Sequence, residues 1–190
     1  VAGGGAGGTE HSGGGGAGGL IYRPAFPITP GSPISVTVGD GGQGYSQNRS
    51  AGQGPAQGFA GDNGQDSVFS TLTAKGGGGG GTWGGGQPVG DAGPQNHREF
   101  GRPGGSGGGV SDDNADAGPS QVGTGIQPTQ SGESGNYGFG NPGGYGNTSN
   151  LGGAGGGAGA AGEPGDGNAA GGVGKQYSIS GTATYYAGGG

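Results

Sequence analysis

The sequence predicts a glycine-rich fold without α-helices, in which a polyproline II bundle is combined with a few short β-strands. Of its 190 residues, 64 are Gly and 12 are Pro, while apolar residues make up only 25 %. Ordinary globular domains are roughly 40 % apolar when glycine is left out of the count, so this chain has little side-chain area to bury. No window repeats apolar residues at helical spacing without several intervening glycines. Disorder is the alternative that such a composition leaves open.

The second observation is a glycine period of three. In-register glycines occur in four stretches: Gly52, Gly58, Gly61 and Gly64; Gly101, Gly104 and Gly107; Gly132, Gly135, Gly138 and Gly144; Gly153, Gly156, Gly159, Gly162, Gly165, Gly171 and Gly174. Polyproline II has three residues per turn, so one residue in three faces a neighbouring strand, where only glycine permits close backbone approach. We expect this conformation chiefly in 52–64 and 152–174. The packing glycines are expected to be Gly153, Gly156, Gly159, Gly162 and Gly165. The Gly-X-Y register is broken too often for a collagen triple helix.

Three β-like islands interrupt the glycine tracts, and we expect strands only there. Residues 34–38 alternate apolar and hydroxyl side chains, 67–74 are rich in Val, Phe, Thr and Leu, and 177–187 carry Ile, Thr and Tyr. Residues 22–28 form a mixed Pro/aromatic stretch that could cover a sheet edge. The sequence predicts one domain over 1–190, with both ends resembling cuts from a longer glycine-rich protein.

Charge and composition exclude several classes of function. The net charge is −6 and only six basic residues are present, all dispersed, so the chain lacks the basic cluster that nucleic-acid binding needs. No run of 18 apolar residues exists, so no membrane insertion is expected. With no Cys, neither disulfides nor thiolate metal sites can form.

Motifs that resemble catalytic signatures lack their context, so we expect no enzyme and no cofactor. Gly39–Gly44 matches a dinucleotide fingerprint, but no helical pattern follows it. Ser106 stands in a G-x-S-x-G match without a supported His partner, since His11 and His97 lie in no suitable context.

A weak calcium candidate consists of Asp112, Asn114 and Asp116, whose oxygens alternate as in calcium-binding loops. Ala117 and Gly123 occupy the positions that such loops reserve for Gly and Glu. A solvated acidic loop is therefore the expected structure, and no metal is expected.

The aromatic residues are the candidates for partner contact. Tyr137, Phe139 and Tyr145 lie among Gly, Asn and Pro, a composition typical of adaptable recognition loops. The alternative is that these rings cap the ends of the bundle. Trp83 is a further candidate for partner contact, and the same alternative applies to it.

The order of several segments along the chain carries a family resemblance. The strand-like 34–38 is followed by Gly-Asp-Gly-Gly at 39–42, Gly64–Phe69, Leu72–Ala74 and the glycine run 76–81. Gly104–Gly109 and the ending Tyr177–Gly190 come later. Over nearly its whole length the chain resembles the glycine-rich domain of bacteriophage tail-fibre and tail-tip (adhesin-like) proteins. The resemblance implies a virion tail or extracellular location and a structural or host-recognition role. Other tail proteins, a host receptor or glycan, and further copies in a homo-oligomer are the implied partners.

Three functions remain open at this point. The leading interpretation is a non-catalytic, structural and receptor-binding domain of a phage tail fibre or tail tip. The alternative is a self-assembling extracellular or surface filament protein. The third is an ice-binding polyproline II protein, which needs a flat regular face that the irregular loops do not suggest.

Overall fold

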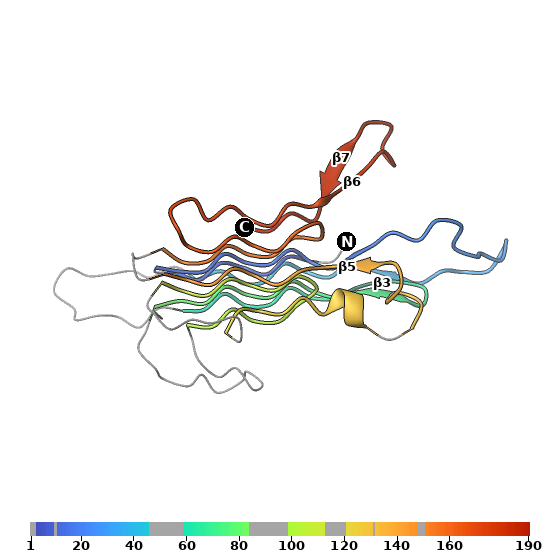
Figure 1. The fold of residues 1–190 in the computed structure, drawn as a ribbon. Coiled ribbons are helices and arrows are strands. Elements are labelled where there is room, and N and C mark those ends of the chain that lie inside the picture. The colour runs from blue at the N-terminus through green and yellow to red at the C-terminus, as the bar shows by residue number, and fades with distance from the viewer. Residues whose placement is uncertain are drawn as a thin grey trace.

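The computed structural model describes residues 3–9, 11–45, 59–83, 99–112, 121–130, 132–147 and 151–190. Extended, wavy tracts run side by side as an elongated bundle, and the β-strands gather at one end of it, here called the strand end (Figure 1). Within these ranges there is no α-helix, and one 3₁₀ turn, η1 (Gln127–Thr129), packs at the strand end. No described helix is long and apolar enough to cross a membrane.

Short antiparallel strands form three small sheets. They are β1 (Leu20–Ile21) with β5 (Gly138–Phe139); β2 (Val36–Thr37), β3 (Ser67–Phe69) and β4 (Leu72–Ala74) in that order; and β6 (Lys175–Tyr177) with β7 (Thr184–Tyr186). The prediction that strands occur only in the three islands is wrong, because β1 and β5 lie outside them and β6 begins at Lys175. Leu20 pairs with Phe139 where two tracts leave the bundle together, a long-range pairing without a local sequence signal.

The tracts are polyproline II, as the hydrogen bonds of residues 76–81 demonstrate. The consecutive N–H groups of this tract donate in turn to three neighbouring segments. Each neighbouring segment therefore accepts a hydrogen bond from every third residue of the tract. The donor–acceptor pairs are Gly76–Asp66 Oδ1 and Gly79–Asn63 Oδ1; Gly77–Gly3 and Gly80–Ala6; Gly78–Ser106 and Gly81–Gly109. A β-ladder would alternate with period two, whereas a period of three matches the polyproline II screw.

The same pattern relates the other tracts, which we name by letter. They are A (3–8), B (13–19), C (39–44), D (60–65), E (76–82), F (99–104), G (105–112), H (121–126), I (140–147), J (151–158), K (161–165), L (170–174) and M (187–190). The expected tract 152–174 is thus three tracts, J, K and L, separated by bends at 158–160 and 165–167. Of the expected 52–64, residues 52–58 lie outside the described ranges.

Glycine is required on more than one face of the central tracts, which corrects the expectation that one residue in three is packed. A Cβ added to any of the five predicted packing glycines of 153–165 would lie within 2.4 Å of a backbone oxygen. The same holds for Gly155 and Gly157, out of that register, at 1.9 and 2.1 Å. Ala158, which lies outside the register of three, is 3 % exposed. Tract J is hydrogen-bonded to tracts B, G, I, K, L and M, so each of its three rows of residues meets backbone.

The stretch 132–144 departs from the expected register in its first half. Gly132 has φ +93° and begins a turn, and Gly138 lies in β5. Only from Gly140 onward does the chain join the bundle as tract I, where Gly144 accepts a hydrogen bond from Val110. Chance phase matches are frequent when glycine is this abundant, and here the match carried no structural meaning.

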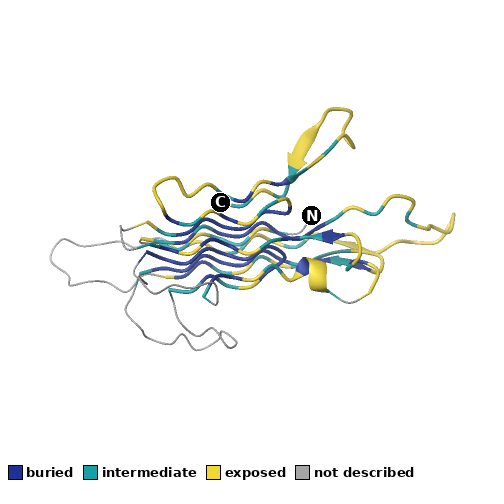
Figure 2. Cartoon of the chain, viewed as in Figure 1, coloured by how far each residue is buried: buried dark blue, intermediate teal, exposed yellow. Residues whose placement is uncertain are grey.

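The interior is built from backbone and very small side chains. Figure 2 shows buried residues concentrated in the tracts and exposed residues at the strand end. Outside glycine, the side chains buried in the tracts are Ala17, Ala60, Thr82, Ser106, Val110, Ser111, Asp112, Val122, Ala154 and Ala158. Inter-tract backbone hydrogen bonds therefore take the place of a conventional apolar core.

Two side chains complete the hydrogen bonding of tract E where no tract lies alongside. Asn63 Oδ1 accepts from the Gly79 N–H at 2.9 Å, and its Nδ2 donates to the carbonyl of Pro103 at 3.1 Å. Asp66 Oδ1 accepts from the Gly76 N–H at 2.9 Å. Polar side chains thus occupy a position that a neighbouring backbone would otherwise fill.

Asn63→Ala is expected to lower the free energy of unfolding by about 1–3 kcal/mol, because it leaves the buried Gly79 N–H without an acceptor. Thermal unfolding followed by circular dichroism measures this. Gln65→Ala, at an exposed neighbouring position, is the matched control and should melt within error of the unchanged chain. Equal melting of both variants would contradict the role assigned to Asn63.

Candidate binding surface

An uncharged arm projects from the strand end. Between Arg23 and Asp40 the chain has no charged residue and contains four prolines. Ile28, Val36 and Val38 on this arm are 63, 61 and 82 % exposed. The arm reverses at a turn in which Ser32 N–H donates to the Thr29 carbonyl, with Gly31 at φ +82°. The arm therefore presents apolar side chains to solvent on a backbone stiffened by proline.

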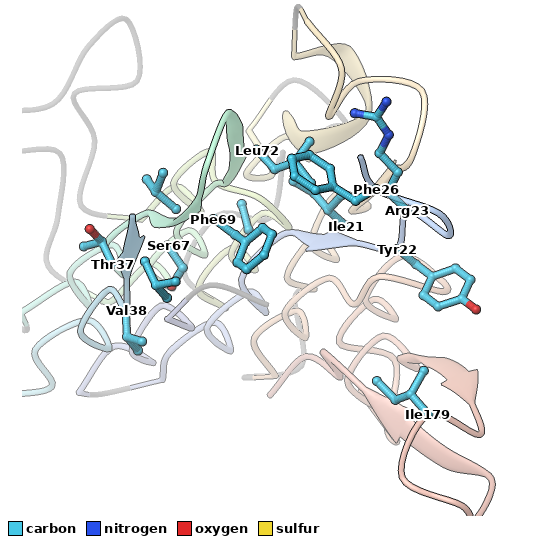
Figure 3. A pocket seen from close by; sticks show the side chains of 13 residues that line it. Ile21, Tyr22, Arg23, Phe26, Thr37, Val38, Ser67, Phe69, Leu72 and Ile179 are labelled. Atoms are coloured by element: carbon cyan, nitrogen blue, oxygen red, sulfur yellow. The ribbon is translucent and has the colours of Figure 1, made fainter. Parts of the chain in front are cut away.

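The base of the arm borders an apolar groove of about 470 Å³. The side chains that line it come from the arm, from β1 to β4 and from the β6–β7 hairpin: Ile21, Tyr22, Arg23, Phe26, Val36, Thr37, Val38, Ser67, Val68, Phe69, Leu72, Ala74 and Ile179. Figure 3 shows Phe26 and Phe69 on neighbouring walls, with Ile179 reaching in from the hairpin. Arg23 is the only charged residue in the lining.

Aromatic contacts hold the walls together. Phe26 meets Phe69 edge to face with 5.5 Å between ring centroids. Tyr22 stacks on Tyr177 at 4.2 Å and so links the arm to the hairpin. Burial in this stack, followed by the charge of Tyr22, raises the pKa of the Tyr177 hydroxyl above its ordinary value. The groove is thus made by segments distant in sequence.

Two cations lie on rings at this end. The Arg23 guanidinium lies 5.3 Å from the ring centroids of both Phe26 and Tyr137, and it pairs with Glu133. Lys175 Nζ lies 4.1 Å from the centroid of Phe139. These contacts place Tyr137 and Phe139 beside the strands, where their rings are partly covered by cations.

The hydrogen bond from Arg23 lowers the pKa of the Glu133 carboxyl below its ordinary value of 4.5. Because the pKa of Glu133 is lowered in the folded state, this ion pair stabilises the fold at pH values at and above the ordinary pKa of a carboxyl group. The contribution is lost as the pH falls through the lowered value. We expect an NMR titration of the Glu133 carboxyl carbon to show a midpoint below 4.5. In Arg23→Gln the midpoint should return to the ordinary range, and an unchanged midpoint would contradict the pairing.

The structure separates the four aromatic residues proposed as contacts. Tyr137, 37 % exposed, and Phe139, half-buried, lie at the strand end. Tyr145, 45 % exposed, lies on tract I, six residues beyond Phe139. At about 3.1 Å per residue, that is roughly 19 Å along the bundle. Trp83, half-buried, follows tract E at the end of that tract away from β4. The four do not form one patch.

The residues examined for catalysis lie apart from the groove. Ser106 is fully buried in tract G, and its Oγ has no hydrogen-bond partner in the described part of the chain. The His11 Nδ1 lies 2.5 Å from Asp112 Oδ2, where the carboxylate is almost fully buried. His97 lies outside the described residues.

Of the calcium candidate, Asp112 is bound to His11, and Asn114 and Asp116 fall outside the described residues. The part of the chain that can be described contains no group of three or more His, Asp or Glu residues placed to hold a metal ion.

Sequence reasoning missed the arm as a surface. It treated 22–28 as a cover for a sheet edge and 34–38 as an ordinary strand, whereas only Val36–Thr37 pair. The available signal was the absence of charge from 24 to 39 together with repeated Pro and β-branched residues. Such a segment has no charged side chains to interact with water, and this chain has no apolar core in which to bury it.

The model of a known family, described as a glycine-rich domain, matches residues 1–190. The chain belongs to this glycine-rich domain family. No curated protein and no solved structure matches it. Family membership agrees with the bundle geometry of this glycine-rich domain, since glycine is the residue that the packing between tracts requires.

Proposed function

We propose that this glycine-rich domain is a non-catalytic structural unit of a phage tail fibre or tail tip, and that its strand end contacts a host receptor or another tail protein. The observation that carries the proposal is the exposed, uncharged arm beside an apolar groove of about 470 Å³. Contiguous apolar surface of this kind typically marks a site of interaction. The tail location rests on the resemblance of the sequence.

The architecture suits a scaffold that presents a surface at one end. The bundle is held by backbone hydrogen bonds along its length, and the arm and the β6–β7 hairpin project from it. Rigid elements position contact residues more accurately than mobile ones do. A stiff rod with an apolar end is the geometry that an adhesive tip requires.

The environments of Ser106 and His11 support a non-catalytic role. Ser106 has no exposed surface, and a substrate would have to part the tracts to reach its hydroxyl. The His11 imidazole is bound to Asp112, and neither residue lines the apolar groove. Groups that share no accessible site with a nucleophile cannot act together in acyl or phosphoryl transfer.

A self-assembling filament is the second candidate, and the strand edges favour it. The β6–β7 hairpin and the sheet edge at β2 end in backbone that pairs with no further described strand. Exposed strand edges can pair with other copies. In that case the strand ends of two copies would meet.

Immunogold electron microscopy with antibodies against the purified domain separates the candidates. Gold at the tails of virus particles supports the proposed function, and gold along fibres without particles supports the filament. Gold on neither structure would refute both. This experiment reads the location of the domain without assuming its receptor.

Val38→Asp tests the strand end as the contact surface in a binding assay of the labelled domain on host cells. We expect at least about a tenfold loss of binding, because a carboxylate at the groove must be desolvated in any apolar contact. Val173→Asp is the matched control, since Val173 is 59 % exposed on tract L and does not line the groove. Equal binding of the two variants would contradict the assignment of the contact surface.

A further inference from the structure

Tract B lies at the centre of an incomplete ring of neighbours. Hydrogen bonds join it to five tracts: A through Gly5–Gly16, E through Gly13–Gly81, G through Gly109–Gly14, J through Gly14–Gly153 and M through Gly190–Gly15. Adjacent members of the ring are also bonded to one another: A to E, E to G, G to J and J to M. Between M and A, no such bond joins the described residues. The ring of described tracts is therefore open at one position.

The hydrogen bonds of tract B identify the same open position, because its N–H groups follow the period of three. One row, Gly13, Gly16 and Gly19, donates to tract E and to Lys75 just before it, and a second row, Gly14 and Ala17, donates to tract J. The third row consists of Gly15 and Gly18, with Ser12 just before the tract, and the N–H groups of these three donate to no described residue. Gly15 and Gly18 are nevertheless buried. Among the described residues, this row of donors therefore has no acceptor.

The walls of this gap are formed by glycines that have no packing role within the chain. A Cβ on Gly4, Gly7 or Gly190 would meet nothing closer than 3.6 Å, and its nearest neighbours would be atoms of tract B. In the described part of the chain, the carbonyls of Gly5, Gly8 and Gly188 accept no hydrogen bond. Within the described residues, donors without an acceptor thus lie on the floor of the gap, and acceptors without a donor lie along both sides.

No contact among the described residues requires glycine at these open positions. None of Gly4, Gly7 and Gly190 has a left-handed φ, so alanine would fit each site and would reduce the entropy lost on folding. At most other tract positions, glycine occurs where another backbone approaches too closely for a Cβ, although Gly41, Gly44 and Gly188 are also open. On tract E the equivalent gap is closed by Asn63 and Asp66, whereas no described side chain closes the gap on tract B.

We propose that the groove along tract B, between tracts A and M, binds a glycine-rich polyproline II strand of a second polypeptide. The strand occupies the sixth position of the ring. Its carbonyls accept from Ser12, Gly15 and Gly18, and its N–H groups donate to the carbonyls along the walls. Recognition is by backbone, so the partner needs glycine wherever its residues face the groove. This groove is separate from the apolar groove of the strand end, and its occupation does not depend on the proposed tail function.

Amide hydrogen exchange measured by NMR on the full chain tests the proposal, with the capped peptide (Gly-Gly-Ser)4 as the probe at millimolar concentration. We expect exchange at Gly15 and Gly18 to slow by about tenfold or more, because their N–H groups gain acceptors. The peptide (Ala-Thr-Ser)4, equal in length and charge, should have no effect because its Cβ atoms prevent close approach. Unchanged exchange with the glycine peptide, or equal protection by both peptides, would overturn the proposal.

The double variant Gly4→Val, Gly7→Val fills the groove with side chains and is expected to abolish the protection. Gly41→Val, Gly44→Val is the matched control, since these two glycines are also open, at 3.8 and 3.9 Å, on tract C, which does not border tract B. Melting curves of both variants establish that the bundle is retained. Protection that persists in the groove variant would overturn the assigned position, and its loss in that variant alone supports it.

Discussion

Gly78→Ala is expected to prevent the chain from folding. The added Cβ would lie 1.8 Å from the carbonyl oxygen of Arg102 and 2.9 Å from the backbone nitrogen of Gly108. Both neighbours are backbone in the interior, so they cannot move without breaking the bonds between tracts E, F and G. We expect a loss of about 4 kcal/mol or more, a large share of the 5–15 kcal/mol that stabilises a typical domain. Amide dispersion in the NMR spectrum and thermal melting measure this.

Gly4→Ala is the control for this prediction. The same methyl group placed on tract A would meet nothing closer than 3.6 Å. Its expected effect is a stabilisation of about 0.4–1 kcal/mol through the unfolded state, or no change. If Gly78→Ala melted like Gly4→Ala, the close backbone packing of tract E would be wrong.

Gln127→Ala is expected to cause the largest loss of stability among substitutions outside glycine. Gln127 in η1 is fully buried and closes the bundle at the strand end. Its Oε1 accepts from the Lys75 N–H at 2.7 Å, and its Nε2 donates to the Thr73 carbonyl at 3.2 Å. Truncation leaves both backbone groups unpaired and opens a cavity beside Gly19. We expect about 3 kcal/mol or more to be lost.

Chemical denaturation of Gln127→Ala beside Gln176→Ala measures this effect, since Gln176 is exposed on β6 and should tolerate truncation. Gln127→Glu adds a second comparison. It keeps the volume of the side chain but replaces the donor that faces the Thr73 carbonyl, so it should also destabilise the chain. Stability in Gln127→Glu equal to that of the unchanged chain would show that shape alone, and not hydrogen bonding, accounts for the role of Gln127.

The prominence of Gln127 could not be predicted from the sequence. It occurs in Gly-Ile-Gln-Pro-Thr, which contains no pattern of burial. Its importance arises because tracts B and E turn toward the strands at the same level, bringing Gly19 and Lys75 to either side of it. Contacts between residues more than fifty positions apart in the chain depend on topology, and local patterns do not encode them.

The candidate surface, too, could be predicted only in part from the sequence. The Tyr/Asn/Gly composition around 137–145 indicated recognition, but tract geometry places Tyr145 far from Tyr137 and covers part of both Tyr137 and Phe139 with cations. The arm of 24–38 could have been recognised from its lack of charge. Its partner walls, from β3, β4 and the hairpin, could not, because three separate segments meet only after the bundle has formed.

The sequence by itself determined the kind of structure: composition excludes a side-chain core, and a glycine period of three selects polyproline II over helix and ladder. The tertiary structure alone decided which glycines are buried on every face, which tracts are neighbours and in which direction they run. The physical reason is that polyproline II satisfies none of its hydrogen bonds within one segment. Every N–H and C=O must find a partner elsewhere in the chain, and glycine, with no side chain, does not specify which partner that is.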